Sequence, residues 1–201
     1  MIIGEYGKFV LLTYCGMVLA LVAMYCFIHG QVANGMMCFI VSGICDLFDG
    51  KVANSFERTD YQKRYGVEID SLCDMISFAA LPAVLILTQL AFNGWSILLA
   101  AIYVLAAVTR LATFNADTKN SEKTSGFFIG VPVTYSALVF PLTYLATATW
   151  WSEGVQWILP IVALGMAYLF VMNRPVPKPR GKAYLFFCLL ALGSLIALWR
   201  L

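Results

Sequence analysis

The sequence predicts an all-α integral membrane protein, a polytopic bundle of six core transmembrane helices with a seventh at its C-terminal end. Of its 201 residues, 61% are hydrophobic and 12% are charged, and this charged fraction is about half that of ordinary soluble domains. Apolar runs near or above the ~18 residues that a helix needs to cross a bilayer recur along the chain. These runs are continuous rather than alternating, which argues against a β-barrel.

Seven helices are expected, separated by segments rich in residues that favour turns. Their predicted bounds are 8–28, 32–54, 66–89, 93–115, 129–150, 154–173 and 183–200. The segment "NRPVPKPRGK" before the last helix holds three prolines and cannot continue a helix. The last helix either crosses the membrane or lies against the bundle. With no soluble domain, long linker or internal repeat in view, residues 1–201 are expected to form a single transmembrane domain.

The positions of the basic residues predict the orientation of the chain. With the N-terminus in the cytoplasm, nearly all Lys and Arg fall on the cytoplasmic side and Arg200 falls outside, as the positive-inside rule requires. The tryptophans gather near the outer helix ends, where an interfacial belt is expected. We therefore expect a cytoplasmic N-terminus and a functional site that faces the cytoplasm.

Cysteine and histidine offer little chemistry here. The six cysteines lie mostly within apolar segments and form no C-x-x-C pair, so they are expected to be small buried side chains. His29 is the single histidine, and no histidine-based metal site or catalytic triad is expected around it. We also expect no nucleic-acid partner.

Four aspartates occupy positions that the hydropathy pattern assigns to helix interiors, within "CDLFDGKVANSFERTDYQKRYGVEIDSLCDMIS". Asp46 and Asp49 are three residues apart near the end of the second expected helix, and Asp70 and Asp74 are four apart near the start of the third. Each spacing places both members of a pair on one helix face. Because these helices are antiparallel neighbours, we expect all four carboxylates to converge below the cytoplasmic surface.

Unpaired carboxylates at that depth would repel one another and carry a large desolvation penalty. Arg110 is a candidate neutralising group, but one arginine is not enough. Oxygen ligands without His or Cys favour Mg²⁺ or Mn²⁺, and two such ions are expected. Two metals can hold a diphosphate, and a carboxylate not wholly engaged with metal can deprotonate an attacking hydroxyl. Asp74 is the candidate for that base, as the deepest of the four acids.

Gly50 and Ala53 lie on the same face as Asp46 and Asp49. Such small residues either pack helices closely, as in small-xxx-small motifs, or leave room for a ligand to approach the backbone. Taken alone, the pair favours packing. Beside four carboxylates, it favours the ligand.

The segment "DLFDGKVA…GVEIDSLCD" resembles the signature of the CDP-alcohol phosphotransferase family (class I CDP-alcohol phosphatidyltransferases), D-x-x-D-G-x-x-A-R followed by G-x-x-x-D-x-x-x-D. Every fixed position except the arginine is present. The stretches "YGVEIDSLCDMISFAALPA", "TRLATFN", "GVPVTYSAL" and "LLTYCG" are similar to segments of the family's phosphatidylserine synthase branch. Together these matches extend over residues 11 to 137.

This resemblance implies a membrane-embedded enzyme with six core helices, commonly a homodimer. It implies transfer of a phosphatidyl group from CDP-diacylglycerol to the hydroxyl of L-serine, with release of CMP and formation of phosphatidylserine. Other acceptors, namely glycerol 3-phosphate, inositol or inositol phosphate, remain alternatives. An ion-coupled transporter is a further alternative because intramembrane carboxylates often mark ion pathways, although broken helices and inverted repeats are not evident. An inactive scaffold is the last alternative.

The resemblance also implies roles for single residues. Asp46, Asp49 and Asp70 would ligate the metal, and Asp74 would act as general base and shared ligand. The implied nucleotide pocket is lined by Thr13, Asp46, Gly50 and Ala53.

Two further residues are implied on the acceptor side. Arg110 would face a substrate phosphate or carboxylate, and Glu68 would attract the serine ammonium. The alternatives are an arginine that snorkels to the membrane surface and a solvated glutamate in the first turn of a helix.

Three departures from the family pattern stand out. Asn54 replaces the signature arginine and removes a cation, which affects the expected affinity for nucleotide or phosphate. The linker "SFERTDYQKRY" is longer than usual and is expected to form a cytoplasmic loop. Ala79 replaces a glycine, which is a mild change.

Overall fold

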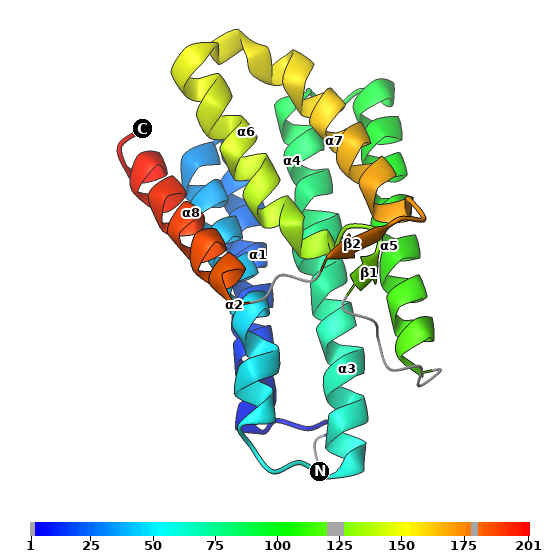
Figure 1. The fold of residues 1–201 in the computed structure, drawn as a ribbon. Helices are drawn as coiled ribbons and strands as arrows, with labels where there is room; N and C mark the ends of the chain where they lie inside the picture. The colour runs from blue at the N-terminus through cyan, green and yellow to red at the C-terminus, as the bar shows by residue number, and fades with distance from the viewer. Residues whose placement is uncertain (1–2, 120–126, 178–180) are drawn as a thin grey trace.

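The computed structural model describes residues 3–119, 127–177 and 181–201. It shows an elongated bundle of packed helices, in which α1, α2 and α3 extend furthest toward the end that holds the N-terminus (Figure 1). The α-helices are α1 (Leu11–Ile28), α2 (Val32–Asn54), α3 (Asp60–Asp74), α4 (Leu81–Gln89), α5 (Gly94–Lys119), α6 (Ser136–Trp150), α7 (Val155–Val171) and α8 (Lys182–Trp199). A short pair of strands, β1 (Phe127–Ile129) and β2 (Pro175–Pro177), lies beside them.

Within the described residues, four helical spans are long and apolar enough to cross a membrane, by length and composition. They are Lys8–Ile28, Val32–Asn54, Asp60–Gln89 and Gly94–Asp117. The other three expected crossings correspond to the shorter helices α6, α7 and α8. The predicted class, an all-α membrane bundle, is confirmed.

The third expected helix, 66–89, begins six residues earlier than predicted, because α3 starts at Asp60 rather than Gly66. Thr59 caps it: the Thr59 hydroxyl accepts from the Gln62 backbone N–H at 3.2 Å, and the Gln62 side chain accepts from the Thr59 N–H at 3.1 Å. This capping box satisfies two donors that a helix start leaves unpaired. The prediction of a loop throughout the charged linker was therefore wrong, because only residues 55–59 lie outside helices.

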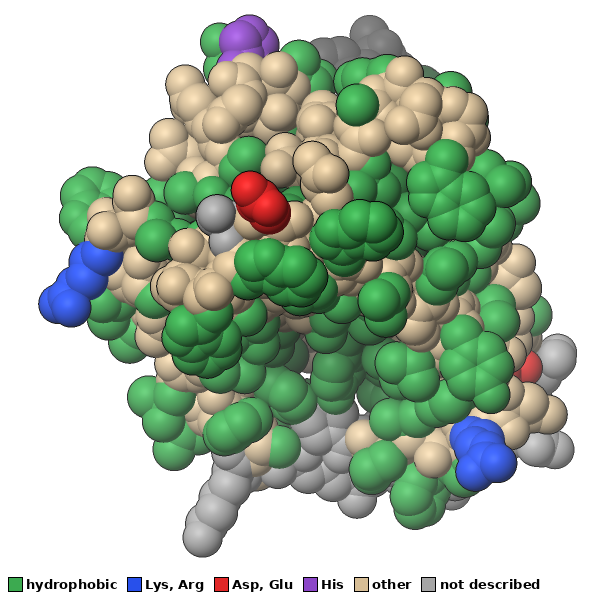
Figure 2. Space-filling model, turned by 90° about the horizontal axis from the view of Figure 1, so that it is seen from above, with side chains coloured by type: hydrophobic (Ala, Val, Ile, Leu, Met, Phe, Trp, Pro, Cys, Tyr) green, Lys and Arg blue, Asp and Glu red, His purple; other side chains and the backbone are tan. Residues whose placement is uncertain are grey.

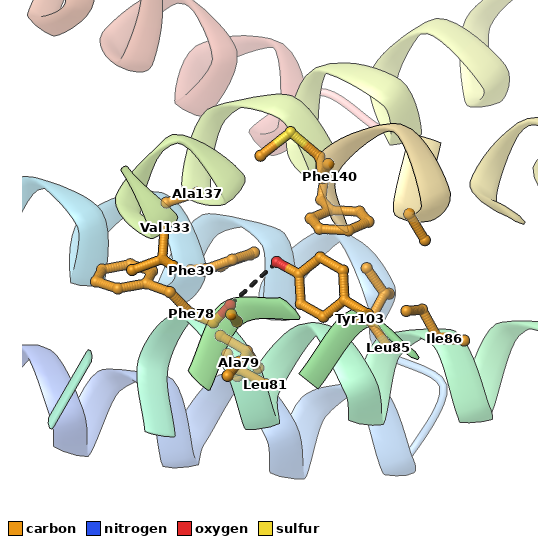
Figure 3. Packing of buried hydrophobic residues seen from close by; sticks show 14 of the residues in the cluster. Phe39, Phe78, Ala79, Leu81, Leu85, Ile86, Tyr103, Val133, Ala137 and Phe140 are labelled. Carbon is orange, nitrogen blue, oxygen red and sulfur yellow. Dashed lines mark hydrogen bonds between the residues drawn. The ribbon is translucent and has the colours of Figure 1, made fainter. Parts of the chain in front are cut away.

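The third span continues past Asp74 through a π-helical turn, Met75–Ala80, into α4. Such wide turns are uncommon and often lie next to functional sites. Here the turn faces the core, where the buried Tyr103 hydroxyl donates to the Phe78 carbonyl at 3.0 Å (Figure 3). Tyr103 also packs edge-on against Phe140 and Phe170, with ring centroids 5.6 Å apart in both pairs.

The fifth expected helix, 129–150, corresponds to α6, which begins later than predicted, at Ser136. Gly130 has a φ of +72°, and a Cβ there would lie 2.6 Å from the Phe170 carbonyl oxygen. The following Pro132 is extended and precedes a short 3-10 turn, Val133–Tyr135. Residues 127–129 instead pair antiparallel with Pro175–Pro177, with Phe128 opposite Val176. Residues 173–177, in the proline-rich segment before α8, are non-helical as expected. Residues 178–180 of that segment lie outside the described residues.

The two ends of the bundle differ in charge. Figure 2 shows the end where α1 meets α2, α4 meets α5 and α6 meets α7, and few charged side chains appear there. These three connections contain one acid, Glu153, and no Lys or Arg. Exposed tryptophans lie on the helix ends and turns at this end: Trp95, Trp150, Trp151, Trp157 and Trp199. The opposite end carries Lys51, Arg58 and Lys63.

Candidate active site

Three aspartates from two helices form the centre of the site. One carboxylate oxygen from each of Asp46, Asp49 and Asp70 lies within 4.8 Å of the others. Asp49 is 8% exposed, and the other two are half-buried. Asp46 and Asp49 share one side of α2, and Asp70 extends from α3. The cluster therefore forms where the acid-bearing sides of these two helices face each other.

Asp74 lies next to this group, one turn further along α3 and immediately before the π-helical turn. Its carboxyl group is within hydrogen-bonding reach of Asp46, as that of Asp70 is of Asp49. Asp74 also borders a small space with Thr13 and Ser77. The acids therefore also pair between the two helices, Asp46 with Asp74 and Asp49 with Asp70.

Two threonines from other helices hold the acids in place. Thr13 in α1 donates its hydroxyl to Asp49 Oδ2 at 2.7 Å. Thr134 in the turn before α6 donates to Asp46 Oδ2 at 2.9 Å. Sequence reasoning assigned no role to Thr134, although it lies in the segment "GVPVTYSAL" that resembles the family. That segment was the signal that could have found it.

Within the described part of the chain, no Lys or Arg forms an ion pair with these four acids. Among the residues that the structure describes, the one ion pair within 4.0 Å joins Lys63 to Asp60, on the exposed surface of α3. Carboxylates this close and this buried need a compensating charge. Their oxygens are the ligands that hard divalent cations prefer, so the side chains present fit Mg²⁺ or Mn²⁺.

A cavity of about 340 Å³ opens beside Asp49 and Asp70; we call it the polar cavity because polar and charged side chains line it together with apolar ones. It brings together three of the residues expected to line a nucleotide pocket, Thr13, Gly50 and Ala53. A Cβ added at Gly50 would meet no atom within 4 Å, so Gly50 does not serve close helix packing. Its missing side chain instead leaves open space beside the acids.

An apolar cavity of about 520 Å³ lies on the other side of the acids, between α2, α6 and α8. Asp46 and Thr134 border it, while much of the remaining lining is apolar, including Leu138, Phe187 and Ala191. Asp46, expected in the nucleotide pocket, therefore borders this cavity rather than the polar one. The acids stand between a polar space and an apolar one.

Arg110 and Glu68 do not line either cavity. Arg110 is 7% exposed in α5, with its guanidinium 5.6 Å from the Phe114 ring and its Nε without a hydrogen-bond partner among the described residues. Glu68 is exposed on α3. The roles expected for Arg110 and Glu68 therefore stay predictions.

Comparison with known proteins identifies the family. A family model described as CDP-alcohol phosphatidyltransferase matches residues 10–169. The chain belongs to the CDP-alcohol phosphatidyltransferase family. The match covers the four acids and both threonines, and it confirms the family predicted from the signature.

Curated relatives carry names from the serine branch of the CDP-alcohol phosphatidyltransferases. The chain is 30% identical over 158 residues to a CDP-diacylglycerol–serine O-phosphatidyltransferase of Mycobacterium tuberculosis, covering 74% of this chain and 53% of the relative. It is 33% identical over 172 residues to the Helicobacter pylori protein of that name, covering 80% and 70%. An archaetidylserine synthase of Methanothermobacter thermautotrophicus is 31% identical over 119 residues, covering 59% and 49%. The chain spans about half the length of the first of these relatives.

Proposed function

We propose that this protein is a CDP-diacylglycerol–serine O-phosphatidyltransferase. It transfers the phosphatidyl group of CDP-diacylglycerol to the hydroxyl of L-serine, forming phosphatidylserine and releasing CMP. The observation that carries this proposal is the convergence of Asp46, Asp49 and Asp70, with Asp74 beside them, in a member of this family. The names of the relatives support serine as the acceptor.

The two cavities suit the two halves of CDP-diacylglycerol. The cytidine and diphosphate would occupy the polar cavity lined by Thr13, Gly50 and Ala53. The acyl chains would enter the apolar cavity between α2, α6 and α8, where their burial is favourable. The diphosphate would then lie at the acids, which stand between the two spaces.

The chemistry assigned to the acids follows from their positions. A bound Mg²⁺ or Mn²⁺ pair, with Asp46, Asp49, Asp70 and Asp74 as the proposed ligands, would neutralise diphosphate charge. Asp74 would accept the proton of the serine hydroxyl as its oxygen attacks the β-phosphorus. A phosphorus–oxygen bond to serine forms, and the bond to the CMP oxygen breaks. Thr13 and Thr134 would keep Asp49 and Asp46 oriented throughout.

The reaction would take place at the cytoplasmic face of an integral membrane protein. The basic residues Lys51, Arg58 and Lys63 lie at the bundle end nearest the polar cavity, and the positive-inside rule supports placing that end in the cytoplasm. Serine would then enter from the cytoplasm. We also propose a homodimer, from the family resemblance.

Release of CMP tests the function directly. Purified protein is incubated with CDP-diacylglycerol, Mg²⁺ or Mn²⁺, and serine, and CMP is measured. We expect serine-dependent CMP release that is lost in Asp74→Asn. Release with glycerol 3-phosphate or inositol but not with serine would reassign the acceptor, and silence with every acceptor would reject the enzyme in favour of an inactive scaffold.

A further inference from the structure

The position of the missing signature arginine has an unexpected neighbour. Asn54, which stands there, accepts a 2.6 Å hydrogen bond through its Oδ1 from Nη2 of Arg58. Arg58 lies beyond the end of α2, in the connection to α3. The chain therefore places a guanidinium beside the position from which the signature would supply one.

Arg58 is held over the polar cavity rather than released to solvent. It is half-buried, whereas residues 54–57 and 59–61 on either side are all exposed. Its guanidinium carbon lies 5.9 Å from the centre of the Phe9 ring. A Cβ added at Gly66 would lie 3.5 Å from Arg58 Nη1, and both residues line the cavity with Asp49.

The charge of Arg58 has no carboxylate partner among the residues described, where the one ion pair within 4.0 Å is that of Lys63 with Asp60. A guanidinium carries five N–H donors, and the bond to Asn54 uses one. The remaining donors border a cavity whose other wall holds Asp49 and Asp70. A group that is anionic, and that bridges acids and arginine, suits this space.

We propose that Arg58 binds a phosphate of the nucleotide and replaces, from the connection after α2, the cation that Asn54 lacks. The Asn54 amide positions the guanidinium through the 2.6 Å bond, and the planar fork of arginine suits phosphate oxygens. The short connection of residues 55–59 between α2 and α3 brings Arg58 back beside Gly66. This inference rests on the proposed function, because it takes the polar cavity as the nucleotide site.

Calorimetric titration of CMP into the purified protein with Mn²⁺ tests the inference. We expect Arg58→Ala to weaken CMP binding about ten- to hundredfold, the range for one charge-assisted hydrogen bond. The KM for CDP-diacylglycerol should rise similarly, with the KM for serine unchanged. Arg64→Ala is the matched control, since Arg64 is an exposed arginine of α3 that does not line the cavity. It should bind CMP like the unmodified protein.

A charge-relocation variant separates phosphate binding from a general loss of structure. Asn54→Arg combined with Arg58→Ala returns the cation to the signature position and should recover most of the lost CMP affinity. Unchanged CMP binding in Arg58→Ala, or no recovery in the double variant, would overturn the inference about Arg58. Neither result would contradict the proposed enzymatic function. If the unmodified protein itself binds no CMP, the proposed function fails instead.

Discussion

The Thr134 hydroxyl donates a hydrogen bond of 2.9 Å to Asp46 Oδ2, across 88 positions of sequence. The bond joins the turn before α6 to the acid-bearing face of α2. The two segments can approach because Gly43, one turn from Asp46, has no side chain: a Cβ there would lie 2.5 Å from the Cβ of Ala137. One close helix contact thus supports a hydrogen bond to a proposed metal ligand.

Removing this hydroxyl should lower activity without unfolding the protein. Thr134→Val keeps the shape of the side chain but cannot donate to Asp46, so the carboxylate loses a bond to a charged acceptor. We expect CMP release to fall about ten- to hundredfold, measured as kcat at saturating CDP-diacylglycerol and serine. Thr134→Ser, which keeps the hydroxyl, should stay near the unmodified rate. Equal loss in both variants would contradict a role for the hydrogen bond.

Two matched Asp→Asn variants can distinguish the proposed general base from a proposed metal ligand. Asp74→Asn removes the proposed base, and kcat should fall about 10²- to 10⁴-fold. Because the three-acid cluster remains, Mn²⁺ should still raise the melting temperature, though by less than in the unmodified protein. Asp49→Asn removes a carboxylate from the three-acid cluster, so the Mn²⁺-induced rise should shrink or vanish. Thermal unfolding with and without Mn²⁺, beside CMP assays, measures both. A full Mn²⁺ response in Asp49→Asn would argue against that residue as a ligand.

Two glycines of α2 should respond oppositely to the same substitution. Gly43→Ala places a methyl group against Ala137, and such overpacking costs about 1–3 kcal/mol, so its melting temperature should fall. Gly50→Ala meets open space and should keep or raise stability, since alanine is favoured over glycine within helices by about 0.5–1 kcal/mol. Yet Gly50→Ala should weaken CMP binding, because its methyl group enters the polar cavity. If Gly50→Ala binds CMP normally, the nucleotide does not approach this backbone.

Filling the apolar cavity should weaken binding of the lipid substrate without changing the affinity for the nucleotide. Cys188→Trp fills part of the space between α2, α6 and α8, and we expect the KM for CDP-diacylglycerol to rise while CMP affinity stays unchanged. Leu189→Trp is the control, since Leu189 is 58% exposed on the same helix and does not line the cavity. An unchanged KM in Cys188→Trp would place the acyl chains elsewhere.

Hydropathy alone predicted the helices whose ends coincide with clear breaks in composition. The predicted second helix, 32–54, matches α2, and the seventh matches α8 within a residue. Thr59 and Gln62 have the spacing of a capping box, which marks the start of α3. Hydropathy did not predict this start because the first turns of α3 are charged rather than apolar. The start of α6 was missed because Gly130 and Pro132 interrupt an otherwise apolar segment.

The sequence by itself determined the membrane class, the family and the helix faces that carry the acids, since a spacing of three or four residues defines a face wherever the helix is placed. Tertiary structure alone decided which side chains meet across that face. Thr134 reaches Asp46 across 88 positions and Arg58 borders the polar cavity beside Asp49, whereas Arg110 lines neither cavity. The reason is that such contacts depend on how closely helices pack and how a connection folds back, and no local spacing encodes either.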